Sequence, residues 1–457
     1  MSDFDVIVLG AGPAGEVCAG RLAKAGLAVA IVERELVGGE CAFYACMPSK
    51  ALLRPAELLA EVARVPGAAQ ALCREVDPVV ALTRRDEVIH DLDDSTQLPW
   101  IEHLGITLIR GFGRLASPEA GARRVTVGER TYEAGRAVVI ATGSGASFPP
   151  ISGLREVKPW TNREATTAKH VPESLLILGG GVVGVELAQA WSSLGARVVL
   201  VEALPRLLSR EEPFAGEQVA DALLRRGVDV HLGAKATAVS RDEAGFALSL
   251  EDGAELFGRE LLVAVGRRPL TQDIGIDELG LEPGRTIDVD DQMRVPGHDW
   301  LFAIGDVNGR VLLTHMAKYQ ARAAADVILG REARVTEDGP RSPRVVFTDP
   351  QVAAVGLTFA AALDAGIRAR AVDVETSGTA GASFYGRGTP GTARIVVDEA
   401  RGVLVGATFT GYEVAEFIHA ATIAIVGEVP VDRLWHAIPA FPTRSELWLK
   451  LLEAYGL

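Results

Sequence analysis

Two cysteines separated by four residues are the side chains of this sequence best suited to chemistry. Cys41 and Cys46 lie in the run Gly-Gly-Glu-Cys-Ala-Phe-Tyr-Ala-Cys-Met-Pro-Ser-Lys, which ends at Lys50. This spacing allows the two sulfurs to meet on the first turns of a helix. Unpaired amide groups and the positive end of the helix dipole stabilise a thiolate there. The pattern therefore predicts a redox-active disulfide.

Size and charge exclude several other kinds of protein. A chain of 457 residues favours two to four domains. The net charge of −14 argues against nucleic acid or an anionic membrane surface as a partner. No apolar run reaches the ~18 residues that span a bilayer, and the acidic N-terminus lacks the basic start of a secretory signal. We therefore expect a cytoplasmic protein that binds neither nucleic acid nor membrane.

The cysteine count supports a reducing compartment. The chain has four cysteines, fewer than a secreted protein held together by disulfides would use. A zinc site would need two more ligands close to Cys41 and Cys46, and none follow at short spacing, so no metal site is expected. Cys18 and Cys73 lie in apolar and Ala-rich helical patterns and are interpreted as small buried side chains.

One pattern occurs twice in the chain, at residues 4–34 and 174–202. Each copy reads as a strand, a glycine turn, a helix, a second strand and a terminal acid. The glycines follow the G-x-G-x-x-G order, which permits a tight turn, close approach to a pyrophosphate and tight helix–strand packing. They are Gly10, Gly12 and Gly15 in the first copy, and Gly179, Gly181 and Gly184 in the second. The repeat predicts two dinucleotide sites.

An acidic residue ends each copy at the same distance from its first glycine. Glu33 and Glu202 lie 23 residues after Gly10 and Gly179, since 33 − 10 and 202 − 179 both give 23. A carboxylate at this place accepts a hydrogen bond from a ribose hydroxyl and repels a 2′-phosphate. Glu202 therefore favours NAD(H) over NADP(H). Arg206 follows closely and is interpreted as a solvated loop charge, with contact to a phosphate as the alternative.

Together, the two glycine motifs and the cysteine pair resemble the class I pyridine nucleotide–disulfide oxidoreductases. This family of flavoproteins includes dihydrolipoamide dehydrogenase, glutathione reductase and mercuric reductase. Further motifs support the resemblance in chain order. They are Thr142-Gly143 and Gly266 at the two crossovers between the FAD and NAD domains, Gly305-Asp306 in the second FAD motif, and residues 348–358 at the entry to the dimerisation domain.

The resemblance implies an α/β fold with two Rossmann-like dinucleotide-binding domains and a C-terminal α+β dimerisation domain. The FAD-binding domain would be discontinuous, at residues 1–148 and 269–335. The NAD(P)H-binding domain would take residues 149–268 and the dimerisation domain residues 343–457. The expected cofactors are FAD and NAD(H), and the expected assembly is a homodimer.

Site roles follow from the same resemblance. Cys41 would be the thiol that exchanges with the substrate, and Cys46 the thiol against the flavin. Lys50 would lie beside the flavin and pair with Glu186, because a buried lysine needs such a partner. His315 would lie near the flavin, with a hydrogen-bonded core or helix-cap histidine as the alternative.

The C-terminal segment departs from the family. The family carries a catalytic histidine in the motif His-Pro-Thr-x-x-Glu; here Phe441 stands at the histidine position, and Pro442-Thr443 and Glu446 align. One interpretation is that His436 substitutes for the missing base. A second is that exchange proceeds without it, on a substrate whose leaving group is already acidic. A third is that the acceptor is a quinone, a metal ion or another molecule that needs no proton relay.

Two further features set this chain apart within the family. Glu40 stands where the family usually has threonine, and no second cysteine pair occurs near the C-terminus, which argues against mercury reduction. The leading hypothesis is an NADH-dependent FAD disulfide oxidoreductase that acts on a small-molecule disulfide or another acceptor. The alternative is an NAD(P)H diaphorase or quinone reductase on the same fold. A non-catalytic FAD-binding partner subunit is the third hypothesis.

Overall fold

The computed structural model describes residues 2–72, 75–116, 123–386 and 390–457. Its chain divides into two compact units. Unit 1 comprises Met1–Pro48, Asp86–Ser147 and Arg267–Gly339, and unit 2 comprises Ser49–Arg85, Phe148–Gly266 and Pro340–Leu457. Two helices belong to both units: α3 (Cys46–Arg64) and α4 (Pro78–Val88).

Unit 1 is built on a sheet with the strand order β16-β17-β6-β1-β2-β3. Strands β17, β6, β1, β2 and β3 run parallel to their neighbours, and the central strands are buried, as their apolar sequences predict. The strands of unit 1 are β1 (Phe4–Leu9), β2 (Val29–Glu33), β3 (Thr107–Arg110), β4 (Gly113–Leu115), β5 (Arg124–Val127), β6 (Arg130–Ile140), β7 (Ser144–Ala146), β15 (Arg267–Pro269), β16 (Arg294–Val295) and β17 (His298–Ala303). Its helices are α1 (Pro13–Lys24), α2 (Gly39–Phe43), α5 (Leu98–His103) and α9 (Thr314–Ile328).

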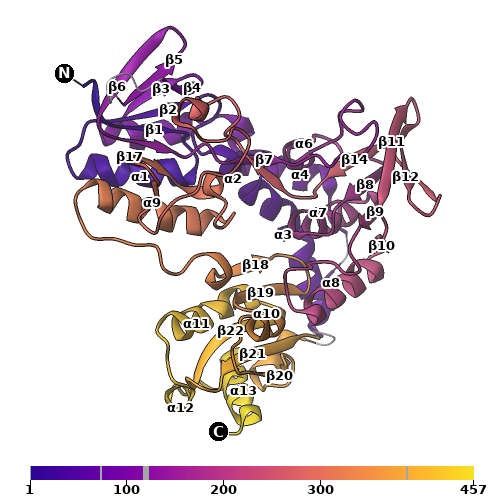
Figure 1. Ribbon diagram of the computed structural model, residues 1–457. Coiled ribbons are helices and arrows are strands. Elements are labelled where there is room, and N and C mark those ends of the chain that lie inside the picture. Colours follow the sequence, from indigo (N-terminus) through magenta and orange to yellow (C-terminus); the bar gives the residue numbers. More distant parts are fainter. Residues whose placement is uncertain (1, 73–74, 117–122, 387–389) are drawn as a thin grey trace. The chain divides into compact units, whose positions relative to one another are not determined.

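Helices α1 and α9 lie side by side on one face of this sheet (Figure 1). Small residues fill the contact, which lets the two helices approach closely: Ala14, Cys18 and Ala19 on α1 belong to one buried cluster with Ala317, Ala321 and Ala324 on α9. Arg21 and Asp326 link the two helices by a bidentate ion pair, with N–O distances of 3.1 and 2.6 Å. The first residue of α9, Thr314, contacts Cys46, so the packing of this helix pair positions that contact.

The second copy of the repeat forms the parallel sheet β10-β9-β8-β14 in unit 2. Helix α7 (Val182–Ser193) has the bounds of α1 shifted by 169 residues, since 182 − 13 and 193 − 24 both give 169. The repeat seen in the sequence is therefore a repeat of structure. This part of unit 2 contains β8 (Ser174–Leu178), β9 (Arg197–Glu202), β10 (Asp229–Leu232), β11 (Ala236–Asp242), β12 (Gly245–Leu250), β13 (Glu255–Gly258), β14 (Glu260–Val263), α6 (Asn162–Thr167) and α8 (Pro213–Arg225).

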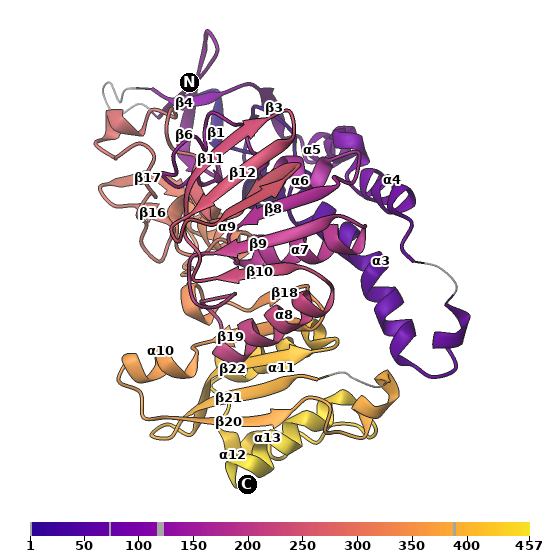
Figure 2. The same ribbon diagram turned by 90° about the vertical axis from the view of Figure 1, so that its right-hand side faces the viewer.

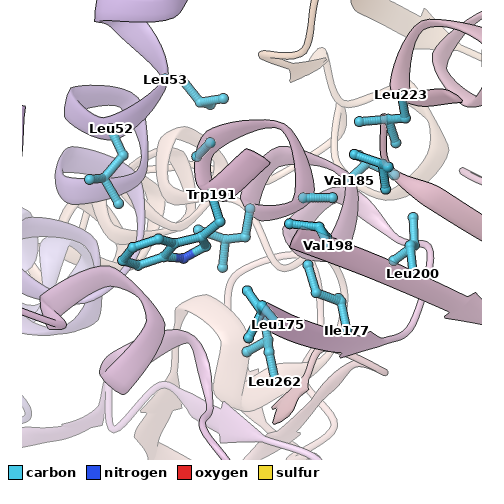
Figure 3. Close-up of a cluster of buried hydrophobic side chains, with 14 of the residues drawn as sticks. Leu52, Leu53, Leu175, Ile177, Val185, Trp191, Val198, Leu200, Leu223 and Leu262 are labelled. Carbon is cyan, nitrogen blue, oxygen red and sulfur yellow. The ribbon is translucent and has the colours of Figure 1, made fainter. Parts of the chain in front are cut away.

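A buried cluster around Trp191 joins helix α3 to this second sheet within unit 2. Figure 3 shows Leu52 of α3 beside Trp191 of α7, with Leu175 of β8 and Leu262 of β14 on the sheet side. Trp191, Leu52, Leu175 and Leu262 are all fully buried. Burial of each such side chain contributes about 2–3 kcal/mol, so the stretch of α3 that follows the cysteines is firmly held.

The C-terminal part of unit 2 is an antiparallel sheet with the order β18-β19-β22-β21-β20, flanked by helices (Figure 2). Its elements are β18 (Arg344–Val346), β19 (Gln351–Gly356), β20 (Ala369–Glu375), β21 (Thr392–Asp398), β22 (Val403–Gly411), α10 (Phe359–Asp364), α11 (Val414–Val426), α12 (Val431–Leu434) and α13 (Leu447–Tyr455). The predicted α/β fold, with two Rossmann-like sheets and a C-terminal α+β part, is confirmed. The domain boundaries stay predictions.

Candidate active site

The two cysteines lie on separate helices. Cys41 is the third residue of the short helix α2, and Cys46 is the first residue of α3, with Tyr44 and Ala45 between the helices. The expectation that both sulfurs sit on the first turns of one helix is therefore wrong. Gly38 and Gly39, which precede Cys41, both have positive φ and turn the chain into α2. The start of α3 presents unpaired amides to Cys46 and favours its thiolate form.

The cysteine pair lies at the start of helix α9. The Cys46 sulfur lies 3.4 Å from the hydroxyl oxygen of Thr314, the first residue of α9. A hydrogen bond with Cys46, and then burial, raise the pKa of the Cys41 thiol, whereas Thr314 and the charge of Lys318 act in the opposite direction. The structure thus places two half-buried thiols beside a hydroxyl group.

The first glycine turn has the shape of a dinucleotide site. Gly10 has φ +104°, and a side chain on Gly15 would lie 1.9 Å from the Gly10 carbonyl oxygen, so the helix can approach the strand only because both are glycine. A side chain on Gly12 would meet nothing within 4 Å, which leaves open space at the start of α1. The Glu33 carboxylate accepts hydrogen bonds from the amides of Ala11 (2.7 Å) and Glu35 (2.8 Å). These features fit the pyrophosphate and ribose of FAD.

The predicted second FAD motif meets the crossover segment inside unit 1. The Ser144 hydroxyl donates to Asp306 at 2.5 Å, and Arg267 donates to the Ser144 hydroxyl and carbonyl, both at 2.6 Å. Arg267 also lies 3.4 Å from Glu40. Burial raises the pKa of Asp306, while Ser144 and Arg267 lower it.

Neighbouring residues of the crossover are also open to a ligand. The Thr142 hydroxyl is buried without a hydrogen-bond partner, as expected for a group that awaits a ligand. Gly143 has φ +73° and open space beside it. Gly305 packs between α1 and α9, where its amide donates to Gln320 at 2.8 Å. These residues therefore fit the FAD role that the motif predicts.

The second glycine turn repeats this arrangement in unit 2. A side chain on Gly184 would lie 1.9 Å from the Gly179 carbonyl oxygen, and one on Gly181 would meet nothing within 4 Å. Glu202 accepts from the amides of Gly180 (2.5 Å) and Leu204 (2.7 Å). Thus both acids brace their own glycine turns, a role additional to the one predicted for them.

Two residues close to the second turn complete the predicted nicotinamide site. Arg206 donates to the Ser209 carbonyl at 2.7 Å and so braces its own loop. Gly266 has φ +136° and open space where a side chain would stand. The site as a whole fits a second dinucleotide.

The expected pairing of Lys50 with Glu186 is confirmed. The Lys50 ammonium lies 2.8 Å from one Glu186 oxygen, and the other oxygen accepts from the amide of Phe347 at 2.9 Å. Lys50 also lies 4.7 Å from the centre of the Phe347 ring. The Glu186 side chain is only 4% exposed, so its charge depends on these partners.

The other predicted residues are exposed or half-buried. His315 is exposed on α9, and His436 is exposed after α12. Glu446 accepts a hydrogen bond from the Gly381 amide at 3.0 Å. Phe441, at the position of the family's histidine, is 76% exposed.

Sequence reasoning missed Thr314, Lys318 and Ser144 as members of these sites. One signal was available: Thr314 and Lys318 are four residues apart at the start of a helical pattern and so share a helix face. Cys18 is fully buried, as predicted, and burial raises the pKa of its thiol to about 12. Cys73 lies outside the described residues.

Two searches of the described residues bear on alternative functions. In them we find no group of three or more His, Cys, Asp or Glu side chains placed to hold a metal ion. No helix in the described part of the chain has the length and apolar character needed to cross a membrane.

Comparisons with known proteins agree with this geometry. Residues 4–321 match the family described as pyridine nucleotide-disulphide oxidoreductase, and residues 342–451 match its dimerisation domain. Dihydrolipoyl dehydrogenase of Chlorobaculum tepidum is 34% identical, over 97% of this chain and 95% of that protein. The enzyme of the same name from Mycobacterium tuberculosis is 32% identical, over 98% and 97%.

Solved structures show the same fold over the whole chain. The Cu(II) complex of RclA, an HOCl-induced flavoprotein disulfide reductase from Escherichia coli, matches with a TM-score of 0.85 at 27% identity and 99% coverage of both chains. LpdA from Mycobacterium tuberculosis matches with a TM-score of 0.87 at 23% identity and 99% coverage of both, which shows the fold alone. With two glycine turns, a cysteine pair and a matching dimerisation domain, the chain belongs to the pyridine nucleotide-disulphide oxidoreductases, flavoprotein enzymes that use FAD and a nicotinamide cofactor.

Proposed function

We propose that this protein is an NADH-dependent disulfide oxidoreductase in which Cys41 and Cys46 form the redox-active pair. The observation that carries the proposal is the arrangement of both thiols against Thr314 in the unit that also holds the first dinucleotide turn. Bound FAD would carry two electrons from the nicotinamide to the Cys41–Cys46 disulfide. We expect this reaction in the cytosol, where a close cysteine pair is more often catalytic than structural.

The protein's own residues would divide the work between them. The Cys46 thiolate is favoured by the start of α3, so Cys46 would keep the negative charge after reduction, while Cys41 exchanges with the acceptor. Lys50, held by Glu186, would place a positive charge one helical turn after Cys46 on α3. Glu33 and Glu202 would each orient a ribose from the braced positions described above.

Anaerobic titration with NADH tests this proposal. The holoenzyme should develop a long-wavelength absorbance band from a thiolate beside the flavin, and Cys46→Ser should abolish it. Cys18→Ser is the matched control, because Cys18 is buried in the α1–α9 contact and should leave the band unchanged. Absence of the band in the wild-type enzyme would show that the cysteine pair takes no electrons.

We further propose that NADH is the preferred nicotinamide. Glu202 lies at the end of β9 and holds the second glycine turn, where it would repel a 2′-phosphate. Glu202→Gln keeps the side-chain length and removes the negative charge. We expect the ratio of kcat/KM for NADH over NADPH to fall about tenfold or more in this variant. A wild-type enzyme that prefers NADPH would contradict the assignment.

A second candidate activity is the reduction of quinones. The observation that favours it is Phe441, an exposed aromatic side chain at the position where the family has its catalytic histidine. A quinone needs no proton from such a histidine. Quinone turnover that survives in Cys41→Ser would support this activity, whereas turnover lost in that variant would place the cysteine pair on the path. Because RclA was solved as a Cu(II) complex, Cu(II) should be assayed as an acceptor alongside quinones.

We also propose a homodimer formed through the C-terminal part of the chain. Residues 342–451 match the dimerisation domain, and large apolar side chains of this part are exposed: Phe384 (66%), Ile423 (58%), Val426 (47%), Ile438 (69%) and Phe441 (76%). Such exposure is typical of an interaction surface. Light scattering after size exclusion should give twice the chain mass of 48.3 kDa. A monomer at micromolar concentration would contradict the proposal.

A further inference from the structure

Phe347 contacts both members of the Lys50–Glu186 ion pair. Its backbone amide donates to one Glu186 oxygen at 2.9 Å, and the Lys50 nitrogen lies 4.7 Å from the centre of its ring. The other Glu186 oxygen accepts from Lys50 at 2.8 Å. An ammonium group within about 6 Å of an aromatic ring centre is attracted by the negative face of the ring. A single residue thus holds the anion through its amide and the cation through its ring.

The Lys50 ammonium group has more donors than the described residues have acceptors for it. It carries three N–H groups, and the described acceptors are Glu186 at 2.8 Å and the Ser49 hydroxyl at 3.3 Å. Among the described contacts, one N–H group therefore remains for a bound ligand. The other contacts of the nitrogen set the direction of this N–H group, because its three N–H bonds are arranged tetrahedrally. The Lys50 side chain is 36% exposed, so the ring restricts a group that would otherwise turn towards water.

The backbone around Phe347 is fixed to helix α7. The amides of Phe347 and Asp349 donate to Glu186 at 2.9 Å and to Gln189 at 2.7 Å, and both acceptors lie on α7. Both acceptor side chains are buried. The Phe347 ring packs against the hydrophobic cluster that contains Trp191. Buried contacts on α7 therefore determine where the ring lies.

Segment 347–351 also binds one stripe of helix α3. Lys50, Glu57 and Arg64 follow one another at intervals of seven residues, about two helical turns, so they lie on one face of α3. Each has a partner in the segment: Lys50 meets the ring of Phe347, Glu57 accepts from Gln351 at 3.0 Å, and Arg64 forms an ion pair with Asp349. The contact between ring and ammonium group is thus held from both α3 and α7.

We propose that Phe347 is a positioning residue for Lys50, and that its ring fixes the direction of the N–H group left for a ligand. This inference rests on the proposed disulfide chemistry, in which Lys50 places a positive charge one helical turn after Cys46. Phe347 acts through Lys50 and needs no contact of its own with the reacting atoms. Because the ring face supplies the attraction, another aromatic side chain should replace Phe347, whereas an apolar side chain without a ring should not.

Acetylation of Lys50 tests the contact without turnover. The oxidised holoenzyme is treated with the N-hydroxysuccinimide ester of acetic acid, and the acetylated fraction of Lys50 is followed by mass spectrometry. Without the attraction of the ring, the Lys50 side chain should turn towards solvent more often. We expect Phe347→Leu to raise the acetylation rate about threefold to tenfold, and Phe347→Tyr to keep the wild-type rate.

Matched controls separate the role of the ring from a general loosening of the fold. Lys235, which is 62% exposed, should be acetylated at the same rate in all variants. Phe257→Leu removes a ring that is 66% exposed in unit 2 and should leave Lys50 unchanged. If Phe347→Leu does not fold, Phe347→Met provides the ring-free side chain. Equal Lys50 rates in the ring-free variant and the wild type would overturn the inference, as would a Phe347→Tyr rate as high as the ring-free rate.

Anaerobic mixing with NADH tests the consequence for the reaction. The rate constant for appearance of the long-wavelength band should fall about threefold to tenfold in Phe347→Leu and stay near the wild-type value in Phe347→Tyr. The NADH concentration that gives half the maximal rate should not change. An unchanged rate constant in Phe347→Leu would overturn the positioning role. Absence of the band in the wild type would instead refute the proposed disulfide chemistry, and because the acetylation test needs no NADH, the two failures are distinguishable.

Discussion

Removal of Lys50 should expose how strongly the buried Glu186 charge depends on it. Lys50→Met keeps most of the apolar side chain and removes the ammonium group that lies 2.8 Å from the carboxylate. Among the described residues, the remaining donor to Glu186 would then be the Phe347 amide, which lies 2.9 Å from the other carboxylate oxygen. Its side chain is 4% exposed, so water reaches it poorly. The variant therefore leaves a nearly unpaired charge inside unit 2.

The size of the loss follows from the exposure of each partner. Removing one member of a fully buried pair costs about 3–5 kcal/mol. The Lys50 side chain is 36% exposed, so solvent already screens part of the attraction, and we expect a loss of about 2–3 kcal/mol for Lys50→Met. Glu186→Gln leaves an ammonium group that can reach water and should cost about 1 kcal/mol. The double variant should cost about 1–2 kcal/mol less than the sum of the single losses.

Urea denaturation of the four proteins, followed by circular dichroism and by flavin release, measures this coupling. The two probes must coincide for the free energies of unfolding to be compared. The ion pair of Lys235 and Glu251 serves as a control, because its atoms are 3.6 Å apart and both side chains are more than 60% exposed. The same cycle there should give a coupling of about 0–0.5 kcal/mol. Single losses at Lys50 and Glu186 that simply add would refute the reasoning.

Three further perturbations have distinct expected outcomes. Gly15→Ala should prevent folding of unit 1 around FAD, because its side chain would lie 1.9 Å from a carbonyl oxygen, whereas Gly12→Ala should fold with the Tm of the flavin-free wild-type protein and lose bound flavin absorbance. Arg85 is fully buried and donates to the carbonyls of Thr166 and Ala168, so Arg85→Met should lower the free energy of unfolding by about 3 kcal/mol, and Arg85→Lys by less. Glu16 has its pKa raised to about 7, so the unfolded chain ionises first and stability should fall as pH rises from about 4.5 to about 7. Above that range Glu16→Gln should be more stable than the wild type by about 2–3 kcal/mol, measured by urea denaturation at pH 8.

The repeated glycine turns could be predicted because their requirement is local. A side chain at Gly15 or Gly184 collides with the carbonyl oxygen of a glycine five residues earlier, so the order of the glycines alone encodes the turn. The Lys50–Glu186 pair joins residues 136 positions apart and was predicted only through the family resemblance. Tyr44 ends α2 with φ −132°, and neither glycine nor proline stands between α2 and α3, so their separation was not visible in the spacing of the cysteines.

Side chains that act through a neighbouring element were the hardest to predict. Thr314 lies 3.4 Å from the Cys46 sulfur, although α9 begins 268 residues after α3 begins, since 314 − 46 is 268. Glu16 reads as an ordinary first-turn acid, which the positive end of a helix favours. In the structure, however, its Oε1 oxygen is buried, which the local sequence does not indicate.

The location of the proton donor decides what the loss of the C-terminal histidine means. If protons came only from that segment, Phe441 would leave the Cys41 thiolate without a partner, and only acceptors that need no proton would be reduced. An acceptor that takes electrons without a proton relay, such as a quinone, would escape this restriction. The exposed aromatic ring of Phe441 would then favour acceptors with a flat, apolar surface.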